Sequence, residues 1–90
     1  MPLIAALFEV TDPAAYRETH QGNEALRRSY GCTDARVFRR PENPNMFLLL
    51  MEFPSIDAGD AFLQDLIQQG GLERATLEGI PRIEAYQDAW

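Results

Sequence analysis

The residues best suited to chemistry lie on one face of a helix predicted over residues 13–30. Advancing 100° per residue from Tyr16 groups seven side chains on that face, of which only one is purely aliphatic. These seven are Tyr16, Thr19, His20, Asn23, Leu26, Arg27 and Tyr30. The opposite face carries Arg17, Glu18, Gln21, Glu24, Ala25 and Arg28, a composition typical of a solvent-facing surface. We therefore expect the first face to point inward and to line a polar pocket against a sheet.

A stripe of His, Asn and Arg can support acid–base chemistry on a small organic molecule. His20 would act as general base, because an ordinary histidine pKa of about 6.5 suits neutral pH. Asn23 and Arg27 would stabilise a developing oxyanion, with Tyr16 and Tyr30 as pocket walls. Oxygenation, cyclisation and isomerisation all fit this arrangement, since each begins with removal of a proton beside a carbonyl.

The same stripe also has a purely structural interpretation. His20 is the only histidine, and a lone inward-facing histidine is often a hydrogen-bonded packing residue that Asn23, one turn away, could satisfy. Arg27 could cover apolar surface with its stem and place its charge at the helix edge. Three hypotheses stay open: an enzyme, a ligand-binding or stress-related module without turnover, and a structural dimer whose polar stripe is satisfied internally. An open pocket beside His20 would favour the first two.

Two residues outside the helix are further candidates for contact with a small molecule. Glu52 ends an apolar strand on the face of Leu48 and Leu50, where it is either a buried acid or reaches water. Trp90 could cover the pocket or a dimer seam.

Several kinds of site are excluded by the composition. One histidine and one cysteine are too few for a usual zinc site, no phosphate-binding glycine loop is present, and there is no lysine for a Schiff base. We expect no metal and no cofactor.

The charge of the chain restricts its partners and location. The net charge is −6, and residues 46–90 carry the excess, with eight acidic residues against two arginines. Such a chain repels phosphate backbones and anionic lipids, so we expect neither nucleic acid nor membrane as a partner. Cys32 has no disulfide partner, and the apolar start lacks basic residues and is interrupted by Glu9. These features predict a soluble, cytoplasmic protein.

The order of predicted elements indicates a single α+β domain over residues 1–90, the ferredoxin-like β-α-β-β-α-β pattern. Strands are expected at 3–10, 33–40, 46–53 and 83–87, helices at 13–30, 56–69 and 72–78, and a turn at 41–45. The helices would cover one face of an antiparallel four-stranded sheet. The other face is apolar, because nearly every residue of 46–53 is apolar, and nothing in the chain remains to cover it. We therefore predict a homodimer through the open sheet face.

Several segments resemble one known group of proteins. These segments are Val10-Thr11-Asp12 followed by Tyr16, the helix end 26–31, the strand, turn and strand start 37–45, and 50–53 followed by Ala61-Phe62. Over nearly its whole length the chain resembles the small dimeric α+β barrel proteins of the antibiotic biosynthesis monooxygenase superfamily, especially those of about this length. The resemblance implies a pocket between helices and sheet in each chain, with two sheets closing a barrel.

The resemblance also implies a range of activities. Relatives include cofactor-independent oxygenases of aromatic polyketides, haem-degrading enzymes, isomerases and cyclases. In the oxygenases the deprotonated substrate itself activates oxygen, held by Asn, Trp, Tyr and Arg side chains, and Asn23 and Arg27 would take such parts here. The chain departs from that pattern in two ways, since its only tryptophan is the C-terminal Trp90 and His20 stands where an apolar aromatic is expected. The predicted substrate is a hydrophobic, enolisable or phenolic small molecule.

Overall fold

Four antiparallel strands form one sheet in the order β2-β3-β1-β4. The computed structural model describes all residues from 1 to 90. The strands are β1 (Leu3–Val10), β2 (Asp34–Arg40), β3 (Asn43–Glu52) and β4 (Leu77–Tyr86). The strands β1 and β3 lie at the centre of the sheet and β2 and β4 at its edges, as the ferredoxin-like pattern requires. The predicted fold class is confirmed.

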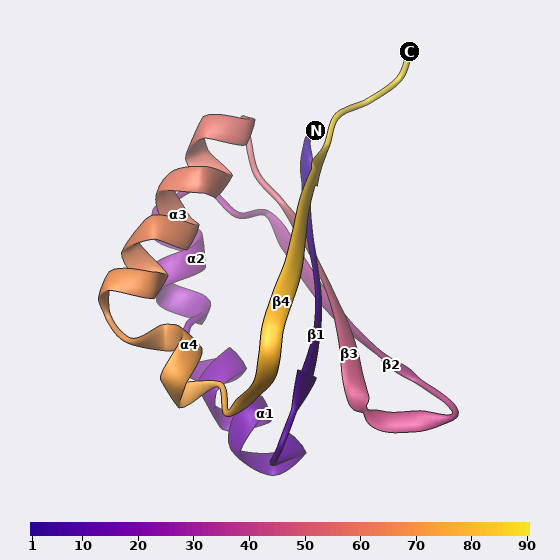
Figure 1. Cartoon of the computed structure of the whole chain (residues 1–90). Helices are drawn as coiled ribbons and strands as arrows, with labels where there is room; N and C mark the ends of the chain where they lie inside the picture. Colours follow the sequence, from indigo (N-terminus) through magenta and orange to yellow (C-terminus); the bar gives the residue numbers. More distant parts are fainter.

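All helices lie on one face of the sheet (Figure 1). They are α1 (Pro13–Gly22), α2 (Glu24–Ser29), α3 (Ile56–Gln68) and α4 (Gly71–Arg74). Asp12 starts α1 by accepting hydrogen bonds from the backbone N–H groups of Ala14 and Ala15 at 3.1 and 3.2 Å. Ser55 starts α3 in the same way, through the N–H of Ala58 at 3.1 Å. These caps fix where each helix leaves the sheet.

The helix predicted over 13–30 is in fact two helices that meet at Asn23. Gly22 weakens the helix before this point, and the Asn23 N–H lies within hydrogen-bond distance of two carbonyls, those of Thr19 at 3.1 Å and His20 at 3.2 Å. The prediction of one continuous helix was therefore wrong. The break at Asn23 is also what separates the site residues of α1 from those of α2.

Two strand boundaries also differ from the prediction. The turn is only Pro41-Glu42, and β3 already begins at Asn43. Pro44 is tolerated in the strand because pairing with β1 ends at Met46, which lies opposite Glu9, so the proline interrupts no hydrogen bond to β1. The short helix α4 ends at Arg74, because Thr76 adopts a left-handed backbone with φ of 57°. The last strand therefore begins at Leu77, six residues earlier than predicted, and a bulge between its pairs with Leu7 and Glu9 absorbs the extra residues.

The core lies between the helices and the inner face of the sheet. Alternate residues of β1 are buried there, namely Ile4, Ala6, Phe8 and Val10. At Gly59 of α3, a Cβ atom would lie 2.7 Å from Ile4 Cγ1, so the absence of a side chain allows α3 to approach β1 closely. The helices and the sheet are thus in close contact at Gly59 and Ile4.

The outer face of the sheet has no helix over it (Figure 1). Leu7 and Leu48 lie directly opposite each other on this face, with Phe38 next to Leu48 in the register. Phe38 is 41% exposed. The last residues, 87–90, extend away from the body of the molecule (Figure 1), and the Trp90 side chain is fully exposed. None of the helices is long and apolar enough to span a membrane.

Candidate functional site

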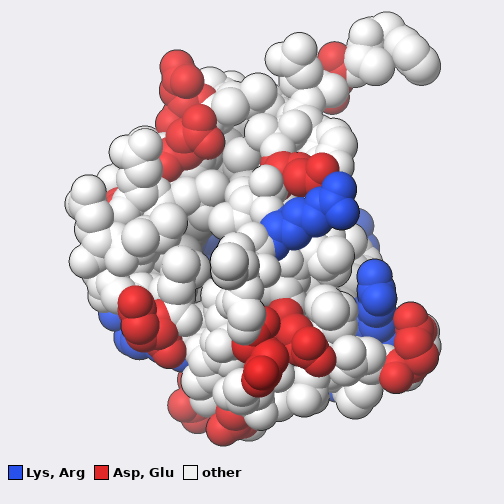
Figure 2. Space-filling model, viewed as in Figure 1, with Lys and Arg blue, Asp and Glu red and all other residues white.

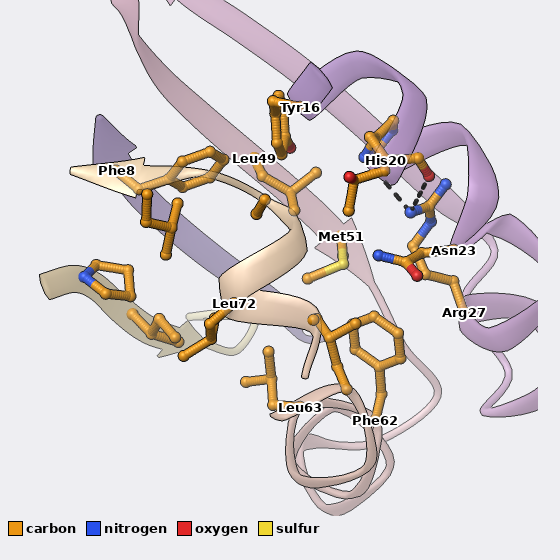
Figure 3. Close-up of a pocket in the computed structure, with 17 residues that line it drawn as sticks. Phe8, Tyr16, His20, Asn23, Arg27, Leu49, Met51, Phe62, Leu63 and Leu72 are labelled. Carbon is orange, nitrogen blue, oxygen red and sulfur yellow. Dashed lines mark hydrogen bonds between the residues drawn. The ribbon is translucent and has the colours of Figure 1, made fainter. Parts of the chain in front are cut away.

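A pocket lies between the helical layer and the inner face of the sheet (Figure 3). Its free space is about 70 Å³, and 11 of its 17 lining residues are hydrophobic. The sheet contributes Phe8, Leu49 and Met51, and α3 contributes Phe62 and Leu63 among others. Figure 2 shows a hollow between the helices and β4 on the same side. The pocket is therefore apolar and open to solvent, and its free space is below the roughly 300–1,000 Å³ typical of small-molecule sites, so a bound molecule would extend out through the open side.

The polar rim of the pocket comes from the predicted stripe. Tyr16, His20, Asn23 and Arg27 all line the pocket. All six residues of the predicted solvent face are exposed, namely Arg17, Glu18, Gln21, Glu24, Ala25 and Arg28. The inward orientation of the stripe is thus as expected, and an open pocket lies beside His20, which was the condition that favours an enzyme or a ligand-binding module.

The structure does not bring the other three predicted contact residues to this pocket. The Tyr30 hydroxyl donates to Asp65 Oδ2 of α3 at 2.6 Å. Glu52 pairs with Leu3 across the sheet and shares the outer face with it. Trp90 lies free in solvent at the end of the chain. Tyr30, Glu52 and Trp90 are thus absent from the pocket lining.

Tyr16 places an unpartnered hydroxyl inside the pocket. Its ring packs against Phe8 and Phe47 at centroid distances of 5.0 and 5.2 Å. The hydroxyl oxygen is buried and has no hydrogen-bond partner, and Figure 3 shows it directed into the space beside Leu49. Burial raises the pKa of Tyr16 to about 12, so the group is a neutral O–H donor at pH 7. A buried donor without an acceptor costs free energy that a bound oxygen atom would recover.

Arg27 is a buried cation without a carboxylate partner. It is 6% exposed, and none of the ion pairs in the structure involves it. Its Nη1 donates to the backbone oxygen of His20 at 2.9 Å and lies 3.4 Å from His20 Nδ1. Burial lowers the pKa of Arg27, yet a guanidinium stays charged at neutral pH. An unpaired charge in this environment strongly favours an anion in the pocket.

His20 differs from the expectation on which its general-base role was based. Burial, and after it the charge of Arg27, lowers the pKa of His20 to about 4. The imidazole is therefore neutral at pH 7. Because Arg27 can only donate, Nδ1 must be the acceptor of their contact, and the ring proton is then on Nε2. At neutral pH His20 is a hydrogen-bond donor through Nε2 and a poor proton acceptor.

Asn23 adds a second neutral polar group. It stands at the break between α1 and α2, and its side chain makes no capping bond to α2. Figure 3 shows the Asn23 amide pointing toward the pocket beside Met51. The amide is therefore available to a ligand.

The apolar walls contributed by β3, α3, α4 and β4 were missed at the level of sequence. Two signals in the sequence could have indicated these walls. Alternation along β3 places Leu49 and Met51 on the other face of the sheet from Leu48 and Leu50. The spacing of Phe62, Leu63 and Leu66 places them on one side of α3. No three His, Cys, Asp or Glu side chains lie close enough to hold a metal ion.

The fold is that of the antibiotic biosynthesis monooxygenase-like proteins of known structure. SnoaB, a cofactor-independent oxygenase from Streptomyces nogalater, aligns with a TM-score of 0.78 at 11% identity, covering 99% of this chain and 92% of its own. A protein from Caulobacter crescentus named as a candidate antibiotic biosynthesis monooxygenase aligns at 0.79 and 17% identity, over 99% and 90% of the two chains. One similarly named from Nitrosomonas europaea aligns at 0.77 and 13%, over the full length of both.

The likeness is confined to structure. No family model and no curated protein matches the sequence. At identities of 11–17%, the matched structures establish the fold and leave the activity to be argued from the pocket. The predicted resemblance to the antibiotic biosynthesis monooxygenase group is confirmed at the level of fold.

Proposed function

We propose that the chain is a small cofactor-independent enzyme that acts on a hydrophobic, enolisable or phenolic molecule. The observation that carries the proposal is that a buried, unpartnered Tyr16 hydroxyl and an unpaired Arg27 cation line the same apolar pocket. A phenolate or enolate meets both requirements, because it presents an oxygen anion on an apolar body. The fold shared with SnoaB, a cofactor-independent oxygenase, supports the same class of reaction.

The first chemical step would be ionisation of the bound molecule. Arg27 would lower the free energy of the anion by its charge, and the Tyr16 O–H would donate a hydrogen bond to the oxyanion, with the His20 Nε2–H as a second donor from the pocket lining. Asn23 provides a further amide donor at the same rim. The released proton would leave to water through the open side of the pocket, because His20, with a pKa of about 4, is too weak a base to hold it at pH 7.

Oxygenation would continue from this anion with molecular oxygen as co-reactant. The carbanion carbon transfers an electron to O₂, and the two radicals combine to form a C–O bond. Protonation gives a hydroperoxide, which loses water to leave a carbonyl, so that R₂CH₂ and O₂ become R₂C=O and H₂O. Cyclisation and isomerisation begin from the same anion, and the pocket residues would serve them equally.

Exchange of the α-protons of 2-tetralone in D₂O, followed by proton NMR, tests the step common to all three reactions. The wild-type protein should accelerate the exchange over buffer, and Tyr16→Phe should slow the protein-catalysed rate about 100- to 1,000-fold, as loss of one oxyanion donor does elsewhere. Arg28→Gln is the matched control, because Arg28 is exposed and paired with Glu24 away from the pocket. No acceleration by the wild type, or equal rates with Tyr16→Phe, would contradict the proposal.

A ligand-binding module without turnover is the second candidate. The observation that favours it is the low pKa of His20, which leaves the pocket without an effective proton acceptor at neutral pH. Saturable binding of 2-naphthol together with unchanged exchange of 2-tetralone would support this candidate and reject the enzyme.

A homodimer through the outer sheet face is part of the proposal. Leu7, Leu48 and Phe38 form an apolar row across three strands of that face, and no helix of the chain covers it. Burial of this row against a second copy would remove apolar area from water and offset the marginal core of a chain this small. Light scattering coupled to size exclusion should give twice the mass of one chain, and a monomer at micromolar concentration would contradict it.

A further inference from the structure

A second cavity lies on the other side of Tyr16 and His20, between α1 and the edge strand β2. Its volume is about 470 Å³, and it is an open groove. Six residues of α1 form one wall, and Val37, Arg39 and Phe47 form the other. Tyr16 and His20 line both the groove and the interior pocket. The two cavities therefore share one boundary, and a molecule bound across that boundary would contact both.

The charge of the groove is opposite to that of the chain. Arg17 and Arg39 stand on its two walls, and no Asp or Glu lines it. Neither arginine takes part in an ion pair. The chain as a whole carries a net charge of −6, and Figure 2 shows carboxylates spread over the face seen in Figure 1. Two cations without ion-pair partners, one on each wall of a groove on such a protein, favour an anionic ligand at this place.

The wall of the groove formed by β2 and β3 is apolar apart from Arg39. Arg39 pairs with Phe47 across the strands, and Val37 pairs with Leu49. Phe47 and Leu49 point toward the helices, so Arg39 and Val37 emerge on the same inner face of the sheet. Val37 remains 37% exposed because no helix covers this edge. Two cations beside an apolar wall fit a molecule with an anionic head and an apolar body.

We propose that the ligand of this protein is an amphipathic carboxylic acid, with its carboxylate between Arg17 and Arg39 and its apolar body passing Tyr16 and His20 toward the interior pocket. This inference rests on the proposed function and specifies its substrate class. The enolisable or phenolic oxygen would then lie on the apolar body, near Tyr16 and Arg27. Carboxylate binding in the groove holds this reacting part in place.

Calorimetric titration of the whole protein with 4-phenylbutyrate and with its neutral amide tests the inference. The acid should bind about fivefold or more tightly than the amide, and Arg17→Gln and Arg39→Gln should each weaken the acid about three- to fivefold while leaving the amide unchanged. Arg28→Gln is the control for loss of one positive charge. Higher salt should weaken the acid alone. Acetate should bind far more weakly than 4-phenylbutyrate, because it lacks the apolar body.

Equal affinities of acid and amide, or an equal effect of Arg28→Gln, would overturn the inference. Tighter binding of 2-phenylethyl phosphate than of 4-phenylbutyrate would also overturn it, since the head group would then be a phosphate. These results are independent of the exchange experiment above. Acid selectivity without 2-tetralone exchange would reject the enzyme and keep the groove, whereas exchange without acid selectivity would reject the groove alone.

Discussion

Replacing Tyr16 with phenylalanine should stabilise the fold while weakening the site. The hydroxyl is buried and makes no hydrogen bond, so its removal breaks no contact and ends the penalty of an unsatisfied donor. That penalty is about 1–3 kcal/mol, and we expect the free energy of unfolding to rise by about 1 kcal/mol, since some of the ring contacts readjust. For a chain of this size the midpoint of thermal unfolding should rise by about 4–8 °C.

The matched control for this variant is Tyr30→Phe. The Tyr30 hydroxyl donates to Asp65 at 2.6 Å, so its removal should lower the free energy of unfolding, opposite in sign to Tyr16→Phe. Urea and thermal unfolding of the three proteins at one fixed concentration would measure both effects. A destabilised Tyr16→Phe protein would refute the reasoning. The Tyr16 hydroxyl would then have a hydrogen-bond partner in the folded state and would not be free to bind a ligand.

Three further predictions concern His20, the outer face and the core. His20 has a pKa lowered from 6.5 to about 4, so stability is full above pH 6.5 and is lost as the pH falls toward 4. Because the ring is only half-buried, solvent screening reduces the effect, and we expect His20 to lower the free energy of unfolding by about 1 kcal/mol between pH 7 and pH 5. The His20→Gln variant should lack this loss. A titration midpoint of His20 near pH 6.5, measured by NMR, would contradict the prediction. Leu48→Glu should give a monomer by light scattering with unchanged far-UV circular dichroism, and a persistent dimer would place the interface elsewhere. Gly59→Ala should cost about 1–3 kcal/mol in urea unfolding, because its Cβ would lie 2.7 Å from Ile4 Cγ1, and an unchanged midpoint would contradict the close approach of α3 to β1.

Local patterns predicted the fold and the polar half of the site. The alternation along β1 matches its burial residue by residue, because one face of a strand meets the core and the other does not. The spacing of Tyr16, His20 and Arg27 correctly predicted one inward face, since Asp12 and Pro13 fix the start of the helix. The roles of these residues in catalysis stay predictions until the exchange experiment is done.

The positions of Tyr30 and Glu52 could not be predicted from local sequence patterns. The helix breaks at Asn23 and ends at Ser29, which directs Tyr30 to Asp65 of α3, a residue far along the chain. Glu52 was ambiguous because the sequence does not state which face of its strand meets the helices. The pairing with Leu3 decides that question, and such pairing depends on contacts between distant segments.

The start of β4 and the pKa of His20 were missed for related reasons. Gly79 and Pro81 favour a turn, yet a bulge opposite β1 accommodates both within the strand and brings Pro81 to the pocket. The pKa of His20 depends on burial and on the position of the Arg27 guanidinium, neither of which is encoded in helical spacing. A cytoplasmic location remains a prediction from composition.

The central claim is that Tyr16 and Arg27 together favour an oxygen anion inside the pocket. Spectrophotometric titration of 4-nitrophenol with saturating protein measures this directly, because the bound phenol and phenolate absorb at different wavelengths. We predict that the pKa of the bound phenol falls by about one unit, which corresponds to about 1.4 kcal/mol in favour of the anion, and falls by less with Tyr16→Phe. A pKa that is unchanged or raised on binding would show that the pocket selects the neutral form, and would contradict the account.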